Sequence, residues 1–168
     1  AGRTRPPEHA EFAMPSGSAY VVEQWAGHPA GCSPLQRQVR ALFEGLVVEP
    51  EDVLAGNLVP FRSPDWASLK NRDESLKFGV ELWRKLLTHA HPKLVIGMGR
   101  EVTAALSALL NTRREKRITV GWGAVTGTRA EFANGTLIGL PHLSRFGIMM
   151  RRESQQGIRR LFGDHWRI

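Results

Sequence analysis

Short apolar runs alternate with amphipathic stretches along most of this chain of 168 residues. The apolar runs have the length and composition of buried strands, and they cover residues 10–14, 52–59, 93–98, 118–122, 128–132 and 136–140. Between several of them, apolar residues recur every three or four positions, as on one face of a helix. These helical stretches follow Ser33-Pro34 and cover residues 76–90, 101–110 and 151–162.

Strands separated by helices favour crossover connections and a parallel sheet. The pattern predicts an α/β fold with a single domain over residues 1–168. We expect a three-layer αβα sandwich whose central sheet of about four strands is mainly parallel. Residues 118–122 and 128–132 are expected to form a hairpin or excursion, Asn134-Gly135 a turn, and residues 1–9 a flexible end.

The composition restricts the class of protein. No apolar run approaches the roughly 18 residues that a membrane helix needs, and the first residues lack the apolar stretch of a signal peptide. Cys32 is the only cysteine, which excludes an internal disulfide, a cysteine zinc site and a four-cysteine iron–sulfur cluster. The scattered histidines suggest no zinc site. We expect a cytoplasmic protein, monomeric, with no metal, cofactor or membrane partner.

The net charge of +7 is concentrated in the last third of the chain. Residues 1–110 hold twelve basic and twelve acidic side chains, whereas residues 111–168 hold eleven and four. Ten of those eleven basic residues are arginine, whose planar fork pairs with phosphate. A solvated arginine-rich surface is one interpretation, and a footprint for a polyanion, DNA above all, is the one we favour. The residues assigned to the DNA backbone are Arg113, Arg114, Arg151 and Arg152.

Three polar loops follow predicted strands, at residues 14–18, 57–64 and 141–147. Ligands bind at the carboxyl ends of the strands in open α/β sheets, so these loops define a candidate site. Asn57 offers a donor and an acceptor side by side, which suits the edge of a base, although its amide could instead pair loop backbone. A neutral His142 imidazole could donate to a developing oxyanion. Ser144 and Arg145 suit phosphate, and Phe146 is either a loop aromatic or a core residue.

The turn at residues 97–100 resembles a fragment of a nucleotide-binding loop. It lacks the third glycine of the dinucleotide fingerprint and is too short for a Walker loop. Tight packing between a strand and a helix is therefore the favoured interpretation.

The order and spacing of the three loops resemble the uracil-DNA glycosylase superfamily over residues 10–163. The residues that carry the resemblance are Met14-Pro15-Ser16-Gly17, Gly56-Asn57-Leu58-Val59-Pro60 and His142-Leu143-Ser144-Arg145-Phe146, with Gly27-His28-Pro29-Ala30-Gly31 between the first two. In that family, a loop with a Pro-Gly core follows the first strand, an Asn-bearing strand follows the next helix, and a His-Pro-Ser loop follows the last strand.

The resemblance implies a role for each matched residue. Asn57 would bind the Watson–Crick edge of an everted base, and His142 would hydrogen-bond the base oxygen and stabilise the base anion. Phe146 would wedge into the duplex, and Ser144 would contact phosphate. Enzymes of this kind flip the nucleotide out of the helix before cleavage.

The chain departs from the family pattern at two positions and leaves one role open. Met14 stands where the family has a polar residue that activates or positions water, so Ser16 and Ser18 are the candidates for that role. Leu143 replaces the proline of the His motif. The aromatic residue that stacks on the base is Tyr20, Trp25 or Phe61.

Three functions follow. The first is a monofunctional DNA glycosylase that flips out and hydrolytically excises uracil or another altered base from single- or double-stranded DNA. The second is a catalytically silent DNA-binding module on the same fold, silent because of Met14. The third is a protein for small nucleotides that uses the turn at residues 97–100.

Overall fold

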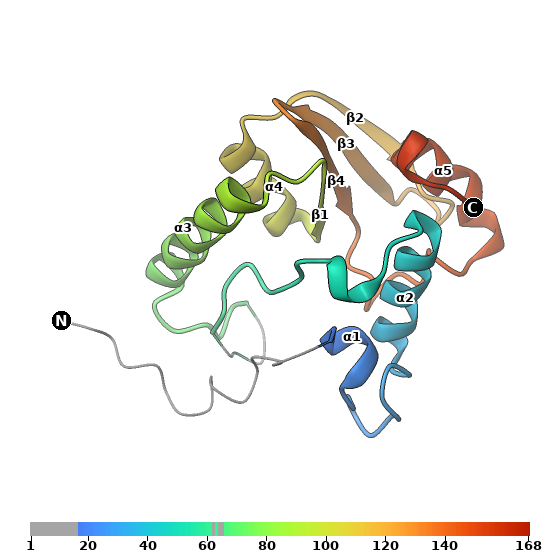
Figure 1. The fold of residues 1–168 in the computed structure, drawn as a ribbon, viewed down its shortest axis with the longest axis horizontal. Coiled ribbons are helices and arrows are strands. Elements are labelled where there is room, and N and C mark those ends of the chain that lie inside the picture. The colour runs from blue at the N-terminus through green and yellow to red at the C-terminus, as the bar shows by residue number, and fades with distance from the viewer. Residues whose placement is uncertain (1–16, 62, 64–65) are drawn as a thin grey trace.

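The computed structural model describes residues 17–61, 63 and 66–168. Four strands form one sheet in this part of the chain, with five helices around it (Figure 1). The helices are α1 (Ala19–Val22), α2 (Pro34–Leu46), α3 (Arg72–Ala90), α4 (Arg100–Leu110) and α5 (Gln155–Phe162). The strands are β1 (Leu94–Met98), β2 (Arg113–Thr119), β3 (Thr126–Phe132) and β4 (Gly135–Leu140). Three 3-10 turns are η2 (Pro50–Asp52), η3 (Arg152–Ser154) and η4 (Gly163–His165).

The strand order is β1-β4-β3-β2, and only β1 and β4 run parallel. The pairs β2–β3 and β3–β4 are antiparallel, so the prediction of a mainly parallel sheet is wrong. The physical reason is loop length, because a parallel pair needs a crossover of a dozen or more residues. Among the strands that pair, only β1 and β4 are separated by that much chain, whereas β3 and β4 are joined by the predicted turn at Asn134.

The apolar run at residues 52–59 is not a strand, which corrects a second prediction. Its first residue ends η2, and the rest forms no regular helix or strand and pairs with no strand of the described sheet. Leu58 and Val59 are nevertheless buried, because the chain crosses α3 at Gly79. A Cβ placed on Gly79 would lie 2.1 Å from the carbonyl oxygen of Leu58. The predicted strand at residues 10–14 lies outside the described residues.

The predicted helices are present. Helix α2 begins with a capping box in which the Ser33 side chain accepts from the Gln36 backbone and the Gln36 side chain accepts from the Ser33 backbone. Such reciprocal pairing satisfies the free N–H groups of a first turn. The helix predicted at residues 151–162 forms as η3 followed by α5.

Helices pack on both faces of the sheet, so the coarse prediction of an α/β sheet of four strands between helices is confirmed. On one face, Ile138 and Leu140 of β4 join a core with residues of α2 and α5. On the other face, Val95 and Leu137 pack against Leu106 of α4. Figure 1 shows α3 beside α4 and α2 below α5, at opposite ends of the view. The carboxyl ends of β1 and β4 point toward α1.

Candidate functional site

The parallel pair β1 and β4 brings the turn at Gly99 next to the loop that carries His142. The Gly99 N–H donates to the carbonyl oxygen of Leu140 over 2.8 Å. A Cβ on Gly99 would lie 3.8 Å from Cδ2 of His142, so the imidazole lies beside the glycine. Gly99 has a φ of 95°, which suits glycine and few other residues. This edge of the sheet is where open α/β folds bind ligands.

Ser144 fixes the tautomer of the exposed His142 ring. Its backbone N–H donates to Nδ1 of His142 over 3.3 Å, and its Oγ lies 2.7 Å from the same nitrogen. An N–H group cannot accept a hydrogen bond, so Nδ1 of the neutral ring is the acceptor and Nε2 carries the proton. The loop therefore presents an exposed N–H donor at the carboxyl end of β4.

The remaining residues of the His142 loop divide between packing and solvent. Leu143 is buried in the main core, and Arg145 is exposed. The Phe146 ring meets Trp122 edge to face, with centroids 6.1 Å apart. The structure therefore shows Phe146 in a packing contact, the alternative noted for it from the sequence.

Asn57 is exposed, not buried in a strand as expected. Its carbonyl oxygen accepts the indole N–H of Trp83 over 3.0 Å, which ties this segment to α3. Figure 1 shows the segment on the side of the sheet that holds the carboxyl ends of β1 and β4. Within the described residues no hydrogen bond joins Asn57 to the His142 loop.

The candidates from the N-terminal part of the chain mostly take packing positions. Ser18 is buried at the start of α1, and Ser16 lies outside the described residues. The Tyr20 ring packs edge to face against Trp25 and Phe43, and burial raises the pKa of its phenol. Phe61 lies against Phe78 of α3, with ring centroids 5.3 Å apart.

The arginines assigned to DNA differ in their surroundings. Arg113 and Arg114 are exposed on β2, which ends the sheet, and Arg114 pairs with Glu131 over 3.2 Å. Arg152 is exposed in η3. The Arg151 guanidinium lies over the Trp122 ring, 4.8 Å from its centroid.

Sequence reasoning missed the side chains that fix the chain after the His142 loop. Gln38 of α2 is buried, and its Oε1 accepts the Met149 N–H over 2.8 Å. Gln155 donates to the carbonyl oxygens of Met149 and Arg151. The sequence signal for this contact was Gln38 itself, a polar residue within the apolar stripe of α2. A polar side chain is costly to bury without a hydrogen-bond partner, so a partner for it could have been expected.

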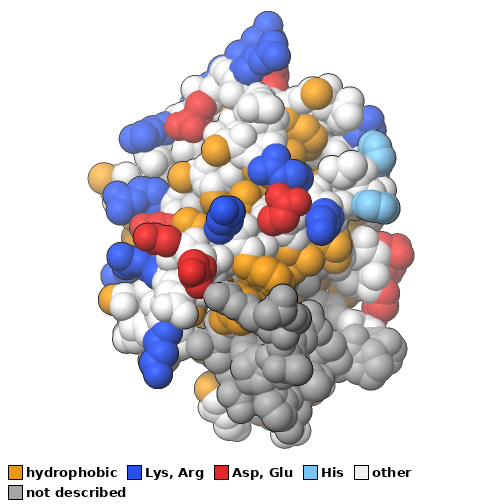
Figure 2. Space-filling model, turned by 90° about the vertical axis from the view of Figure 1, so that its left-hand side faces the viewer, with side chains coloured by type: hydrophobic (Ala, Val, Ile, Leu, Met, Phe, Trp, Pro, Cys, Tyr) orange, Lys and Arg blue, Asp and Glu red, His pale blue; other side chains and the backbone are white. Residues whose placement is uncertain are grey.

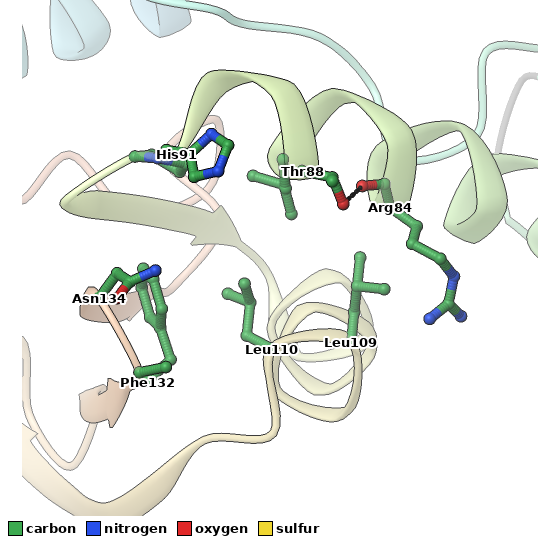
Figure 3. A pocket seen from close by; sticks show the side chains of 10 residues that line it. Arg84, Thr88, His91, Leu109, Leu110, Phe132 and Asn134 are labelled. Carbon is green, nitrogen blue, oxygen red and sulfur yellow. Dashed lines mark hydrogen bonds between the residues drawn. The ribbon is translucent and has the colours of Figure 1, made fainter.

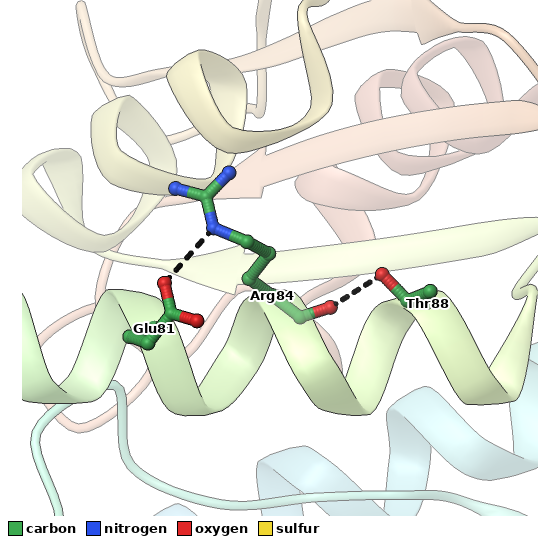
Figure 4. Close-up of polar contacts among 3 residues, drawn as sticks. All are labelled: Glu81, Arg84 and Thr88. Atoms are coloured by element: carbon green, nitrogen blue, oxygen red, sulfur yellow. Dashed lines mark hydrogen bonds and ion pairs between the residues drawn. The ribbon is translucent and has the colours of Figure 1, made fainter.

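A groove of about 280 Å³ lies at the opposite edge of the sheet, before β1 and β4 begin (Figure 3). Leu109 and Leu110 of α4 and Phe132 of β3 supply apolar surface, with Arg84 and His91 at its ends. Figure 4 shows that Arg84 is engaged on its own helix: Nε lies 3.2 Å from Glu81 Oε2, and its carbonyl oxygen accepts the Thr88 hydroxyl over 2.8 Å. The groove is thus separate from the His142 edge.

The face that Figure 2 shows carries basic and acidic side chains interspersed, with apolar side chains between them. In the described part of the chain, no three His, Cys, Asp or Glu residues gather where they could hold a metal ion. None of the helices described is both long and apolar enough to cross a bilayer.

No protein-family model matches the chain, and comparison with curated proteins and with solved structures finds no significant match.

Proposed function

We propose that the protein binds DNA and excises an altered base by hydrolysis of its N-glycosidic bond. One observation carries the proposal: the Ser144 N–H donates to Nδ1 of the exposed His142 ring, and this contact directs the other ring nitrogen, Nε2, to act as the N–H donor at the carboxyl end of β4. The resemblance of the three loops to the uracil-DNA glycosylase superfamily and the arginine excess of the last third support it.

The chemistry follows from that donor. As the bond between C1′ and the base nitrogen breaks, its electron pair moves onto the base, and negative charge builds on the base oxygen. A fixed N–H aimed at that oxygen stabilises the charge. A water molecule then adds to C1′, and the proton that it loses neutralises the base anion. The products are an abasic site and the free base.

Substitution of His142 tests the role of this donor. In single-turnover excision of a base from labelled oligonucleotides, detected as strand cleavage after alkali, His142→Ala is expected to be slower by roughly 10²–10³-fold. The matched control is His91→Ala, because His91 is also exposed but lies at the other edge of the sheet. Equal excision by the wild type and His142→Ala would refute the assignment.

Ser144→Ala sharpens the test. It removes the hydroxyl but keeps the backbone N–H that donates to Nδ1. The tautomer therefore persists, and we expect a smaller loss than for His142→Ala. A loss as large as that of His142→Ala would assign Ser144 a role beyond holding the ring.

A catalytically silent DNA-binding module is the second candidate, and the position of Ser18 favours it. Ser18 is the candidate for holding water that lies inside the described residues, and it is buried at the start of α1. The assay should carry oligonucleotides with uracil, thymine mismatches, hydroxymethyluracil, hypoxanthine, xanthine and modified cytosines. Salt-sensitive DNA binding without cleavage of any of them would establish the silent module.

A further inference from the structure

Arg151 and Arg152 are adjacent in the sequence, but the structure holds only the first of them in place. The carbonyl oxygens of Met149 and Arg151 both accept from the Gln155 amide, over 2.8 and 3.2 Å. The Met149 N–H is held by buried Gln38. The backbone that leads into Arg151 is therefore fixed from α2 and α5 together.

The side chain of Arg151 is fixed as well. Its guanidinium carbon lies 4.8 Å from the centroid of the Trp122 ring, a distance at which cation and ring attract. The inner Nε is buried and lies 3.2 Å from Glu153 Oε2, without the alignment of a hydrogen bond. The side chain as a whole keeps 40% of its surface exposed. Because Nε is buried, only the two nitrogens at the outer end of the fork are left to face solvent or a ligand.

Trp122 connects this arginine to the candidate site. The indole lies in the connection between β2 and β3, and its ring meets Phe146 of the His142 loop. Arg151 is therefore held at a set position relative to His142 through two ring contacts. The Arg152 side chain is exposed, and among the described residues it makes no ring contact or ion pair of this kind.

We propose that the outer guanidinium nitrogens of Arg151 form a binding site for a backbone phosphate of DNA, and that Trp122 is the residue that positions them. The inference deepens the proposed function and rests on DNA being the partner. Arginine binds phosphate through two parallel N–H groups. A fork already held against an indole loses little side-chain freedom on binding, which favours the complex. Glu153 opposes the phosphate by its charge.

The test is the salt dependence of binding to an unmodified mixed-sequence DNA oligonucleotide, which makes the readout independent of excision. Each phosphate contact contributes about −0.9 to the slope of log affinity against log salt for duplex DNA. We expect Arg151→Ala to weaken binding roughly tenfold and to reduce the slope by about one. Arg152→Ala is the matched control. The sequence alone assigned Arg152 to the DNA backbone as well, but its exposed side chain would have to be ordered on binding, so we expect this variant to change affinity by less than about threefold.

Variants around Arg151 separate position from charge. Trp122→Leu keeps every charge, yet we expect it to lose most of the affinity that Arg151→Ala loses. Trp122→Phe keeps a ring under the guanidinium and is expected to restore binding, with thermal unfolding confirming that each variant is folded. Glu153→Gln removes the opposing charge and is expected to strengthen binding.

Equal effects of Arg151→Ala and Arg152→Ala, or unchanged affinity in Trp122→Leu, would overturn the inference. Failure of the proposed excision gives a different result: the wild type binds the oligonucleotide, the Arg151 and Trp122 variants still weaken binding, and no base is released. A wild type that binds neither single- nor double-stranded DNA would overturn both proposals.

Discussion

Replacing Gly79 by alanine tests how the segment that carries Asn57 is held. Gly79 lies in the middle of α3, and its Cβ would stand 2.1 Å from the Leu58 carbonyl oxygen and 3.3 Å from Cα of Val59. Contacts under 3.0 Å essentially never occur for a real Cβ. The obstacle is backbone, not the flexible end of a side chain. Gly79→Ala must therefore separate the segment from the helix.

The expected change in the free energy of unfolding follows from opposing terms. Complete loss of burial of Leu58 and Val59 would cost about 3–6 kcal/mol, and a shift that half-exposes them about half as much. Breaking the bond between Trp83 and Asn57 adds about 0.5–1 kcal/mol. Alanine returns about 1 kcal/mol through its higher helix propensity. The balance is a destabilisation of about 1–3 kcal/mol.

Thermal and urea unfolding measure this balance. For a chain of this length we expect Tm to fall by roughly 3–10 °C. The matched control is Lys77→Ala, an exposed position on the same helix, which should change stability by less than about 0.5 kcal/mol. A Gly79→Ala variant more stable than the wild type would show that helix propensity alone acts there. The reasoning that places residues 57–59 against α3 would then be refuted.

Three further predictions concern the core and its charged partners. Gln38→Ala leaves the Met149 N–H without its acceptor and should destabilise the fold by about 1–3 kcal/mol in urea unfolding; a loss no larger than that of exposed Gln24→Ala would contradict this. Arg129 donates to the carbonyl oxygens of Leu161 and Phe162, so Arg129→Met should destabilise by about 1.5–3 kcal/mol, whereas a result equal to exposed Arg117→Met would deny that role. Tyr20 is the only tyrosine and burial raises its pKa, so its absorbance titration should have a midpoint above the ordinary value of about 10. As the pH rises, the folded state keeps this proton longer than the unfolded chain does, so the contribution of Tyr20 to stability is complete below about pH 10 and is lost as the pH rises toward the folded pKa. Tyr20→Phe should therefore lose less stability over that range than the wild type. Equal losses in the two proteins would refute the effect.

The parts of the fold that the sequence predicts correctly are those set by neighbouring residues. Ser33 and Pro34 mark the start of α2 because capping is a contact within one turn. Asn134-Gly135 marks the turn between β3 and β4 for the same reason. The predicted direction of the strands was wrong, although the lengths of the loops determine it. The connections between β2, β3 and β4 are too short for parallel crossovers.

The prediction of a strand at residues 52–59 was wrong for a different reason. An apolar run predicts that its side chains are buried, but it does not identify the element that covers them. Here a glycine on α3 lets the backbone approach, and the helix takes the place of neighbouring strands. The pairing of His142 with Ser144 and the stacking of Arg151 on Trp122 depend on side-chain direction and on contacts between distant segments. Neither could be read from residue types and spacing.

The basic residues of the last third do not act as one surface, although the sequence presents them as one excess of charge. Arg129 caps the end of α5, and Arg114 pairs with Glu131. The charges on β2 also have a structural purpose, because this strand ends the described sheet and carries a register shift between Arg113 and Lys116. Charges and bulges on such a strand prevent pairing with the edge of another sheet. Net charge therefore overstates the proposed DNA-binding surface. If DNA is the partner, the slope of log affinity against log salt should reflect only arginines whose side chains are fixed and accessible, and Arg151 beside the His142 loop is the first of these.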